Sequence, residues 1–320
     1  MSVLKVHLTY QCTAACAHCR FGCTPEPAPV IDGDLVLACV RELQSWNDLK
    51  LVVLLGGEPA LHAGLTHRLA ATIHALGIGV RIETNAGWAT SDDAAEAFLG
   101  PLYREGASVM FSLDAFHEPF VKPERVIRAI RVSEALGGKH SLESAYLNAE
   151  HRTHPLDQRT DALLSMAFEA LGREPPIYRG TVLYNGRAAH RLANEVAKGR
   201  GVPTGPCLAA PWWIDSDLDT LDLLILDPDG YISKGCGIAI GNVNEQPLRE
   251  MLSTFDARTH PIFSTLMTDG PIGLAREAEA MGYELKADYA DRCHLCQEAR
   301  EALRDKYPHY LQPTQHYKLN

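Results

Sequence analysis

Three cysteines near the amino terminus, Cys12, Cys16 and Cys19, have the spacing of a cluster-binding loop. They lie within eight residues and follow the β-branched stretch 3–9, so the loop leaves a predicted strand. Three thiolates can hold three corners of a four-iron cluster and leave the fourth iron open to another ligand. Zinc also accepts thiolates, but a structural zinc site needs a fourth ligand, and His18 is too close to Cys19 to supply it easily. The loop therefore predicts an iron–sulfur cluster with one open iron.

Four later cysteines, Cys207, Cys236, Cys293 and Cys296, form a second candidate metal-binding set. Two residues separate Cys293 from Cys296, which is a common spacing of metal ligands. Cys236 follows the Asp-Pro-Asp-Gly turn 227–230, and the apolar stretches on both sides of that turn predict a β-hairpin. Four cysteines can ligate a second iron–sulfur cluster completely. A zinc site would use the same number of ligands.

Glycine and polar residues follow the ends of several predicted strands. Gly56 and Gly57 permit close approach of the backbone to a ligand, and the carboxylate of Glu58 can accept hydrogen bonds from an ammonium group. For Asp114 a helix cap is the alternative role. Polar side chains at consecutive strand ends of a barrel point toward one site. The other residues of this kind are Asn85, Ser112, Asp114 and Arg187.

Six short apolar stretches alternate with helical patterns through the first two thirds of the chain. This alternation predicts parallel strands joined by right-handed crossovers. Six units are too few for a closed eightfold barrel, so we expect an α/β fold with a partial (β/α)6 TIM-like barrel. A shift to Gly, Pro and Thr near residue 200 predicts a barrel domain over 1–200 and a small hairpin-and-helix iron–sulfur domain over 201–320. The predicted strands are 3–8, 51–55, 80–83, 108–113, 140–146 and 177–183.

The composition of the 320 residues narrows the functional classes. A formal charge of −10 argues against a nucleic-acid partner, since such proteins usually carry a basic face. The amino terminus leads directly into a strand, and no apolar stretch approaches the length of a membrane span. Nine cysteines without a secretion signal predict a reducing cytoplasm. Cys39 falls on the apolar side of a predicted helix and Cys23 follows the cluster loop, so we expect both to pack in the core.

The cysteine loop and the Gly-Gly-Glu-Pro turn together resemble the radical S-adenosylmethionine (SAM) superfamily. The resemblance implies a four-iron cluster on Cys12, Cys16 and Cys19, whose open iron binds the amino and carboxylate groups of SAM. It also implies contacts with SAM. Gly56, Gly57 and Glu58 would hold the amino group, and Asn85 and Ser112 would meet the ribose or the carboxylate. Asp114 and Arg187, the latter in a Gly-Arg-Ala step, would complete the site.

The four later cysteines resemble the auxiliary-cluster domain called twitch, a relative of the SPASM domain. This second resemblance implies another four-iron cluster on Cys207, Cys236, Cys293 and Cys296. Family chemistry then implies that an external electron donor, such as flavodoxin or ferredoxin, reduces the first cluster. SAM is cleaved to methionine and a 5′-deoxyadenosyl radical, which removes a hydrogen atom from the substrate. The auxiliary cluster would accept an electron, bind substrate or support the fold.

The substrate is predicted by resemblance alone. The stretch 112–126, the hairpin turn and the pair Cys293–Cys296 look most like peptide epimerases, so a ribosomally made peptide is the expected substrate, modified by epimerisation, oxidation or bond formation. Those enzymes carry two adjacent hairpin cysteines, whereas this chain offers only Cys236, which is either a cluster ligand or a hydrogen donor. His117 touches substrate, transfers a proton or makes a structural hydrogen bond. The alternatives are a small-molecule enzyme, namely a sugar or aminocyclitol dehydrogenase or epimerase, and a non-enzymatic two-cluster electron-transfer protein.

Overall fold

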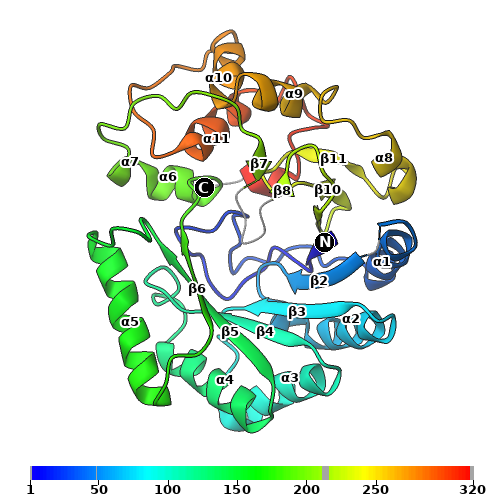
Figure 1. Ribbon diagram of the computed structural model, residues 1–320, viewed down its shortest axis with the longest axis vertical. Coiled ribbons are helices and arrows are strands. Elements are labelled where there is room, and N and C mark those ends of the chain that lie inside the picture. Colours follow the sequence, from blue (N-terminus) through cyan, green and yellow to red (C-terminus); the bar gives the residue numbers. More distant parts are fainter. Residues whose placement is uncertain (1, 48, 211–215, 318–320) are drawn as a thin grey trace. The chain divides into compact units, whose positions relative to one another are not determined.

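The computed structural model describes residues 2–47, 49–210 and 216–317 (Figure 1). The chain forms two compact units. The barrel unit comprises Val3–Cys16 and Cys23–Val182. The carboxyl-terminal unit comprises Ser2, Ala17–Gly22 and the described residues from Leu183 onward. The short segment Ala17–Gly22 therefore packs with a part of the chain that follows it by more than 160 residues.

The barrel unit contains six strands in the order β1-β2-β3-β4-β5-β6, and the pairs from β2 to β6 are parallel. Helices alternate with the strands and lie along the outer side of the curved sheet (Figure 1). The predicted α/β class and partial barrel are confirmed, and the predicted strands begin and end within two residues of the observed ones. The elements are β1 (Ser2–His7), α1 (Gly33–Asn47), β2 (Leu49–Leu55), η1 (Pro59–His62), α2 (Ala63–Ala75), β3 (Gly79–Thr84), α3 (Asp92–Arg104), β4 (Ser108–Ser112), α4 (Pro123–Ala135), β5 (Lys139–Tyr146), α5 (Pro155–Leu171) and β6 (Ile177–Thr181).

Local sequence sets the ends of these helices. The hydroxyl oxygen of Ser91 accepts a hydrogen bond from the backbone N–H of Ala94, which caps α3. Pro123 occupies the first turn of α4, where a missing N–H has no cost. Gly172 ends α5 with a φ of 70°, in the left-handed region that favours glycine. These signals set where α3 and α4 begin and where α5 ends.

The two faces of β3 differ in polarity. Val80 and Ile82 are buried, whereas Arg81 and Glu83, which alternate with them, are only half-buried. Strands of a parallel sheet that is covered on both faces read as continuous apolar runs, so alternation indicates one polar face. On that face Nζ of Lys5 from β1 lies 3.3 Å from Oε1 of Glu83. The barrel unit therefore carries charged groups on the face of its sheet that the apolar side chains of β3 do not occupy.

The carboxyl-terminal unit is built from short elements around a hairpin. Strands β9 and β10 pair antiparallel, and β10 also pairs with β11. Asp227 Oδ1 accepts hydrogen bonds from the N–H groups of Asp229 and Tyr231, and Gly230 has a φ of 87°, so the predicted hairpin is confirmed. The elements are α6 (Arg187–Arg191), α7 (Ala193–Val196), β7 (Ala209–Ala210), β8 (Ser216–Asp217), β9 (Leu223–Leu226), β10 (Tyr231–Ser233), β11 (Ala239–Asn242), α8 (Leu248–Thr254), α9 (Pro261–Thr268), α10 (Pro271–Glu279), α11 (Arg292–Ala302) and η2 (Thr314–Tyr317).

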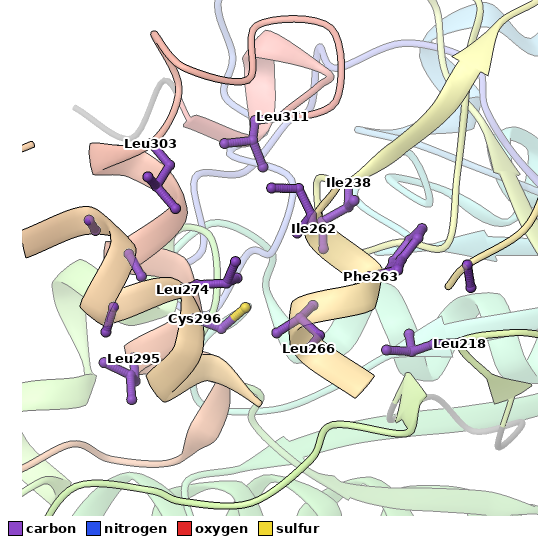
Figure 2. Close-up of a cluster of buried hydrophobic side chains, with 14 of the residues drawn as sticks. Leu218, Ile238, Ile262, Phe263, Leu266, Leu274, Leu295, Cys296, Leu303 and Leu311 are labelled. Atoms are coloured by element: carbon purple, nitrogen blue, oxygen red, sulfur yellow. The ribbon is translucent and has the colours of Figure 1, made fainter. Parts of the chain in front are cut away.

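A separate hydrophobic core holds this second unit together (Figure 2). Helices α9, α10 and α11 supply most of the core, including the fully buried residues Ile262, Leu274 and Leu295. Cys296 lies within the core, and Figure 2 shows its sulfur pointing from α11 toward Leu266 of α9. One cysteine of the second predicted set therefore faces the interior of a packed helical layer.

The boundary between the two compact units lies between Val182 and Leu183. The domain boundary near residue 200, expected from the change in composition, stays a prediction. In the described parts of the chain, every helix is too short or too polar to cross a lipid bilayer.

Candidate functional site

The loop that carries the first three cysteines is anchored by backbone hydrogen bonds. Cys12 and Cys16 are buried in the barrel unit, and the N–H of Cys12 donates to the carbonyl of Thr24 over 2.8 Å. Cys19 belongs to the carboxyl-terminal unit, where its carbonyl accepts a hydrogen bond from the N–H of Arg187 over 3.0 Å. Cys23 and Cys39 are both buried as expected, and burial raises the pKa of the Cys39 thiol to about 12.

The glycine turn after β2 packs directly against the start of the cysteine loop. A Cβ atom on Gly57 would lie 1.8 Å from the carbonyl oxygen of Gln11, so only glycine fits there. The N–H of Gly57 donates to the carbonyl of Thr9 over 2.7 Å, and that of Glu58 donates to Gln11 over 2.9 Å. Gly56 has a φ of 140°, and a Cβ atom there would lie 2.5 Å from the carbonyl oxygen of Thr9. The glycines thus let two loop backbones approach each other and fix where the cysteine loop begins.

The side chain of Glu58 is fully buried, with 1% of its surface exposed. Its Oε1 accepts hydrogen bonds from Thr84 Oγ1 over 2.7 Å and from the N–H of Ala60 over 3.1 Å. Its Oε2 accepts from the N–H of Asn85 over 3.0 Å. Burial raises the pKa of Glu58, and these hydrogen bonds oppose that rise. The carboxylate therefore joins the end of β2 to the end of β3, and a contact with the amino group of SAM stays a prediction.

Asn85 lies against the cysteine loop. Its Nδ2 is 3.5 Å from Sγ of Cys12 and donates to Thr13 Oγ1 over 3.0 Å. Its Oδ1 accepts from the N–H of Gly87 over 2.8 Å, which holds the amide in one orientation. The structure thus brings Asn85, Glu58 and Cys12 together, as the strand-end pattern predicted. Thr13 and Thr84 also belong to this network, and the sequence reasoning did not single them out.

Asp114 and His117 form a second pair beside the loop. Oδ1 of Asp114 accepts from Nδ1 of His117 over 2.9 Å and from the N–H groups of Phe116 and His117. Its Oδ2 accepts from the N–H of Ala145 over 3.1 Å. Burial lowers the pKa of His117, but Asp114 and a hydrogen bond with Cys16 outweigh burial and raise it well above its ordinary value. Asp114 therefore orients a histidine that contacts a cysteine of the loop.

Ser112 ends β4 and is paired in register with Glu143 on β5. Burial and the neighbouring Glu83 raise the pKa of Glu143 to about 7. Sequence reasoning missed Lys5, Glu83 and Glu143 as parts of the polar face. The available signal was the charged residue at every second position of an otherwise apolar strand, which is unusual for a parallel sheet.

Arg187 is buried at the start of α6 in the carboxyl-terminal unit. Its backbone N–H donates a hydrogen bond to the carbonyl oxygen of Cys19. Arg20, the neighbour of Cys19, donates from Nε to Asn185 Oδ1 over 3.2 Å and from its other end to the carbonyl of Gly235 over 3.4 Å. Arg20 therefore connects the loop that carries Cys19 with the loop that carries Cys236.

The four later cysteines line one cavity within the carboxyl-terminal unit. Burial, with the neighbouring cysteines, raises the pKa of Cys207 to about 12 and that of Cys293 well above its ordinary value. Thiols crowded in this way lose their protons when a cationic metal core compensates their charge. The donor set therefore fits a metal cluster. The residues that line the cavity are Asn185, Cys207, Leu218, Cys236, Ile238, Leu266, Pro271, Arg292, Cys293, Cys296 and Arg300.

Comparisons with known proteins show that part of the chain is similar to a known superfamily. Residues 6–151 match the radical SAM superfamily, and this range contains Cys12, Cys16, Cys19 and Glu58. The putative peptide biosynthesis protein YydG of Bacillus subtilis (strain 168) is 21% identical over 165 residues, which cover 51% of this chain and 52% of YydG. The chain thus matches about half the length of that relative.

Solved structures are similar in fold. Native anSMEcpe with bound AdoMet and the Cp18Cys peptide has a TM-score of 0.52 and 12% sequence identity, with 96% of each chain covered. Streptococcus suis SuiB bound to S-adenosylmethionine has a TM-score of 0.48 and 14% identity, with 78% of this chain and 65% of SuiB covered. The match over residues 6–151 confirms the resemblance predicted from the cysteine loop: this part of the chain is similar to the radical SAM superfamily.

Proposed function

We propose that this protein is a radical SAM enzyme that removes a hydrogen atom from a peptide substrate and thereby modifies the peptide. The observation that carries the proposal is the superfamily match over residues 6–151, which spans both the cysteine loop and the Gly56–Glu58 turn. The peptide substrate is supported by the similarity to YydG, whose name describes a peptide biosynthesis protein. Epimerisation, oxidation and bond formation are the three candidate outcomes.

In this proposal Cys12, Cys16 and Cys19 hold a four-iron cluster, which supplies the electron for reductive cleavage of SAM. Flavodoxin or ferredoxin in a reducing cytoplasm delivers that electron to the protein. The turn at Gly56 and Gly57 fixes the start of the loop, because its N–H groups bind the loop carbonyls. The remaining proposed contacts with SAM come from Glu58, Asn85, Ser112, Asp114 and Arg187.

We also propose that Cys207, Cys236, Cys293 and Cys296 hold a second four-iron cluster. The proposal is supported by the cavity that the four cysteines share. Cys236 lines this cavity together with the other three, which favours a ligand over a hydrogen donor. Replacing Cys236 by alanine tests the choice: loss of about half the iron supports ligation. Full iron together with loss of solvent deuterium from the product would support the donor role.

Formation of 5′-deoxyadenosine tests the enzyme class. The anaerobically reconstituted protein, given SAM and dithionite, is expected to release 5′-deoxyadenosine and methionine. The variant in which Cys12, Cys16 and Cys19 are all alanine is the matched control and should release neither. A reconstituted protein with full iron that leaves SAM intact would contradict the proposal and favour an electron-transfer role. SAM turnover is then measured with peptides encoded near the gene and with sugars and aminocyclitols. The class of compound that increases the turnover identifies the substrate class.

A further inference from the structure

Arg300 on α11 is fully buried, with 1% of its surface exposed. It lies one helical turn after Cys296, so the two side chains share a face of α11. Its Nε lies 3.2 Å from the carbonyl oxygen of Cys296 and 3.3 Å from Sγ of the same residue. The guanidinium therefore presents an N–H group to a sulfur of the second cysteine set.

The other end of the guanidinium reaches the hairpin loop. One terminal nitrogen of Arg300 donates to the carbonyl oxygen of Cys236 and, over 2.8 Å, to the hydroxyl of Tyr317. The Tyr317 hydroxyl donates in turn to the carbonyl oxygen of Gly237. Gly237 has a φ of 71°, and a Cβ atom there would lie 2.7 Å from the ring of His316 and 3.1 Å from the Arg300 guanidinium, so glycine suits this crowded position. One side chain thus fixes the backbone of Cys236 relative to Cys296.

The charge of Arg300 has no carboxylate partner among the residues that the structure describes, where no Asp or Glu oxygen lies within 4.0 Å of it. Burying an unpaired charge is strongly unfavourable unless other groups compensate it. Arg300 instead lines the cavity together with Cys207, Cys236, Cys293 and Cys296. The cysteines of this cavity become anions when a bound metal core displaces their protons.

We propose that Arg300 is a positioning residue for an anionic iron–sulfur cluster in this cavity, and that it also compensates the charge of that cluster. This inference rests on the second cluster proposed above. A four-iron core with four thiolates is a dianion, and reduction adds another negative charge. Hydrogen bonds to the sulfurs and nearby positive charge raise the reduction potential of such clusters. Arg300 therefore holds Cys236 in place as a ligand and makes the second cluster easier to reduce.

The test uses the variant that lacks Cys12, Cys16 and Cys19, so that only the second cluster remains. Its iron content and midpoint potential, from a redox titration followed by electron paramagnetic resonance, are compared with those after Arg300→Met. We expect a shift to a more negative potential, with the equilibrium constant for reduction falling at least tenfold, which is 59 mV for a one-electron couple. Arg300→Lys keeps the charge but loses the fork geometry, and we expect it to retain more iron and a smaller shift.

Arg276→Met is the matched control. Arg276 is an exposed arginine of α10 and does not line the cavity, so its loss should leave the potential unchanged. Loss of iron in Arg300→Met but not in Arg300→Lys also supports the inference. Full iron and an unchanged potential in Arg300→Met would overturn it and leave the second cluster intact. Equal loss of iron in Arg300→Met and Arg300→Lys would contradict the claim that the positive charge of Arg300 compensates the charge of the cluster. A parent variant without any iron would instead contradict the second cluster itself.

Discussion

The side-chain amide of Asn85 lies 3.5 Å from the sulfur of Cys12 and is fixed there by Gly87 and Thr13. Resemblance to the superfamily assigns Asn85 to SAM, whereas its position in the structure is that of an N–H donor to Cys12, a predicted cluster ligand. Hydrogen bonds to cluster sulfurs raise the reduction potential. The same side chain can therefore affect the first cluster before SAM is bound.

Replacing Asn85 by alanine is expected to make the first cluster harder to reduce in the absence of SAM. A hydrogen bond to a charged group contributes about 1.5–3 kcal/mol, so the shift should be measurable in a redox titration followed by electron paramagnetic resonance. Asn194→Ala removes an exposed asparagine of α7 and serves as the control. An unchanged potential combined with weaker SAM binding would show that Asn85 acts on SAM alone.

Replacing Glu58 by glutamine is expected to destabilise the fold as well as the site. The amide NH2 of glutamine would face one of the N–H or O–H groups that now donate to the carboxylate. A buried donor left without an acceptor costs about 1–3 kcal/mol. The measurement is the urea midpoint of unfolding, with the exposed Glu96→Gln on α3 as the control. Unchanged stability with a large loss of SAM affinity would instead support a direct contact with SAM.

The intact protein, purified without oxygen, is expected to bind about eight irons per chain as two four-iron clusters. The triple alanine variant of Cys12, Cys16 and Cys19 should keep about half of them. Iron, sulfide and zinc analysis of both proteins is the measurement. About four irons with one zinc in the intact protein would mean that the second site is a zinc site, and the radical SAM assignment would stand.

Stability is expected to depend on the ionisation of Glu143. Burial and Glu83 raise the folded-state pKa of this carboxyl from 4.5 to about 7, so the folded state holds the proton more tightly than the unfolded state. The stabilising contribution is therefore fully present below the unfolded pKa and is lost as the pH rises through about 7. Thermal unfolding midpoints between these pH values should fall less in Glu143→Gln than in the parent. The exposed Glu124→Gln on α4 should retain the parent profile, and an identical profile in Glu143→Gln would contradict the assignment.

The strands and the hairpin were predictable because each depends on a few neighbouring residues: Asp227, for example, caps its own turn. The loop glycines were predictable as a motif with Glu58, but the close contact of Gly57 with Gln11 joins two separate loops and was not. The hydrogen-bond partners of Glu58 were not predictable, because Thr84 and Asn85 come from the next strand and their orientation depends on the register of the sheet. The resemblance supplied a role for Glu58 without supplying those partners.

Arg300 was overlooked for a different reason. Its spacing of four residues from Cys296 is visible in the sequence, but arginine in a helix is usually exposed. Only the packing of α11 against the hairpin loop shows that the guanidinium is buried beside two cysteines. The polar face of the barrel was not predicted, because the prediction of each strand depended on its apolar residues, which occupy the other face.

The membership of Ala17–Gly22 in the carboxyl-terminal unit has a consequence for the order of events during synthesis. Arg20 is made early, yet its partners Asn185 and Gly235 follow 165 and 215 residues later. The carbonyl oxygen of Gly22 accepts a hydrogen bond from Gln315, which follows it by 293 residues. Contacts between residues so distant in sequence form slowly and late. The segment that carries Cys19 therefore reaches its final conformation only after Asn185, Gly235 and Gln315 have been synthesised.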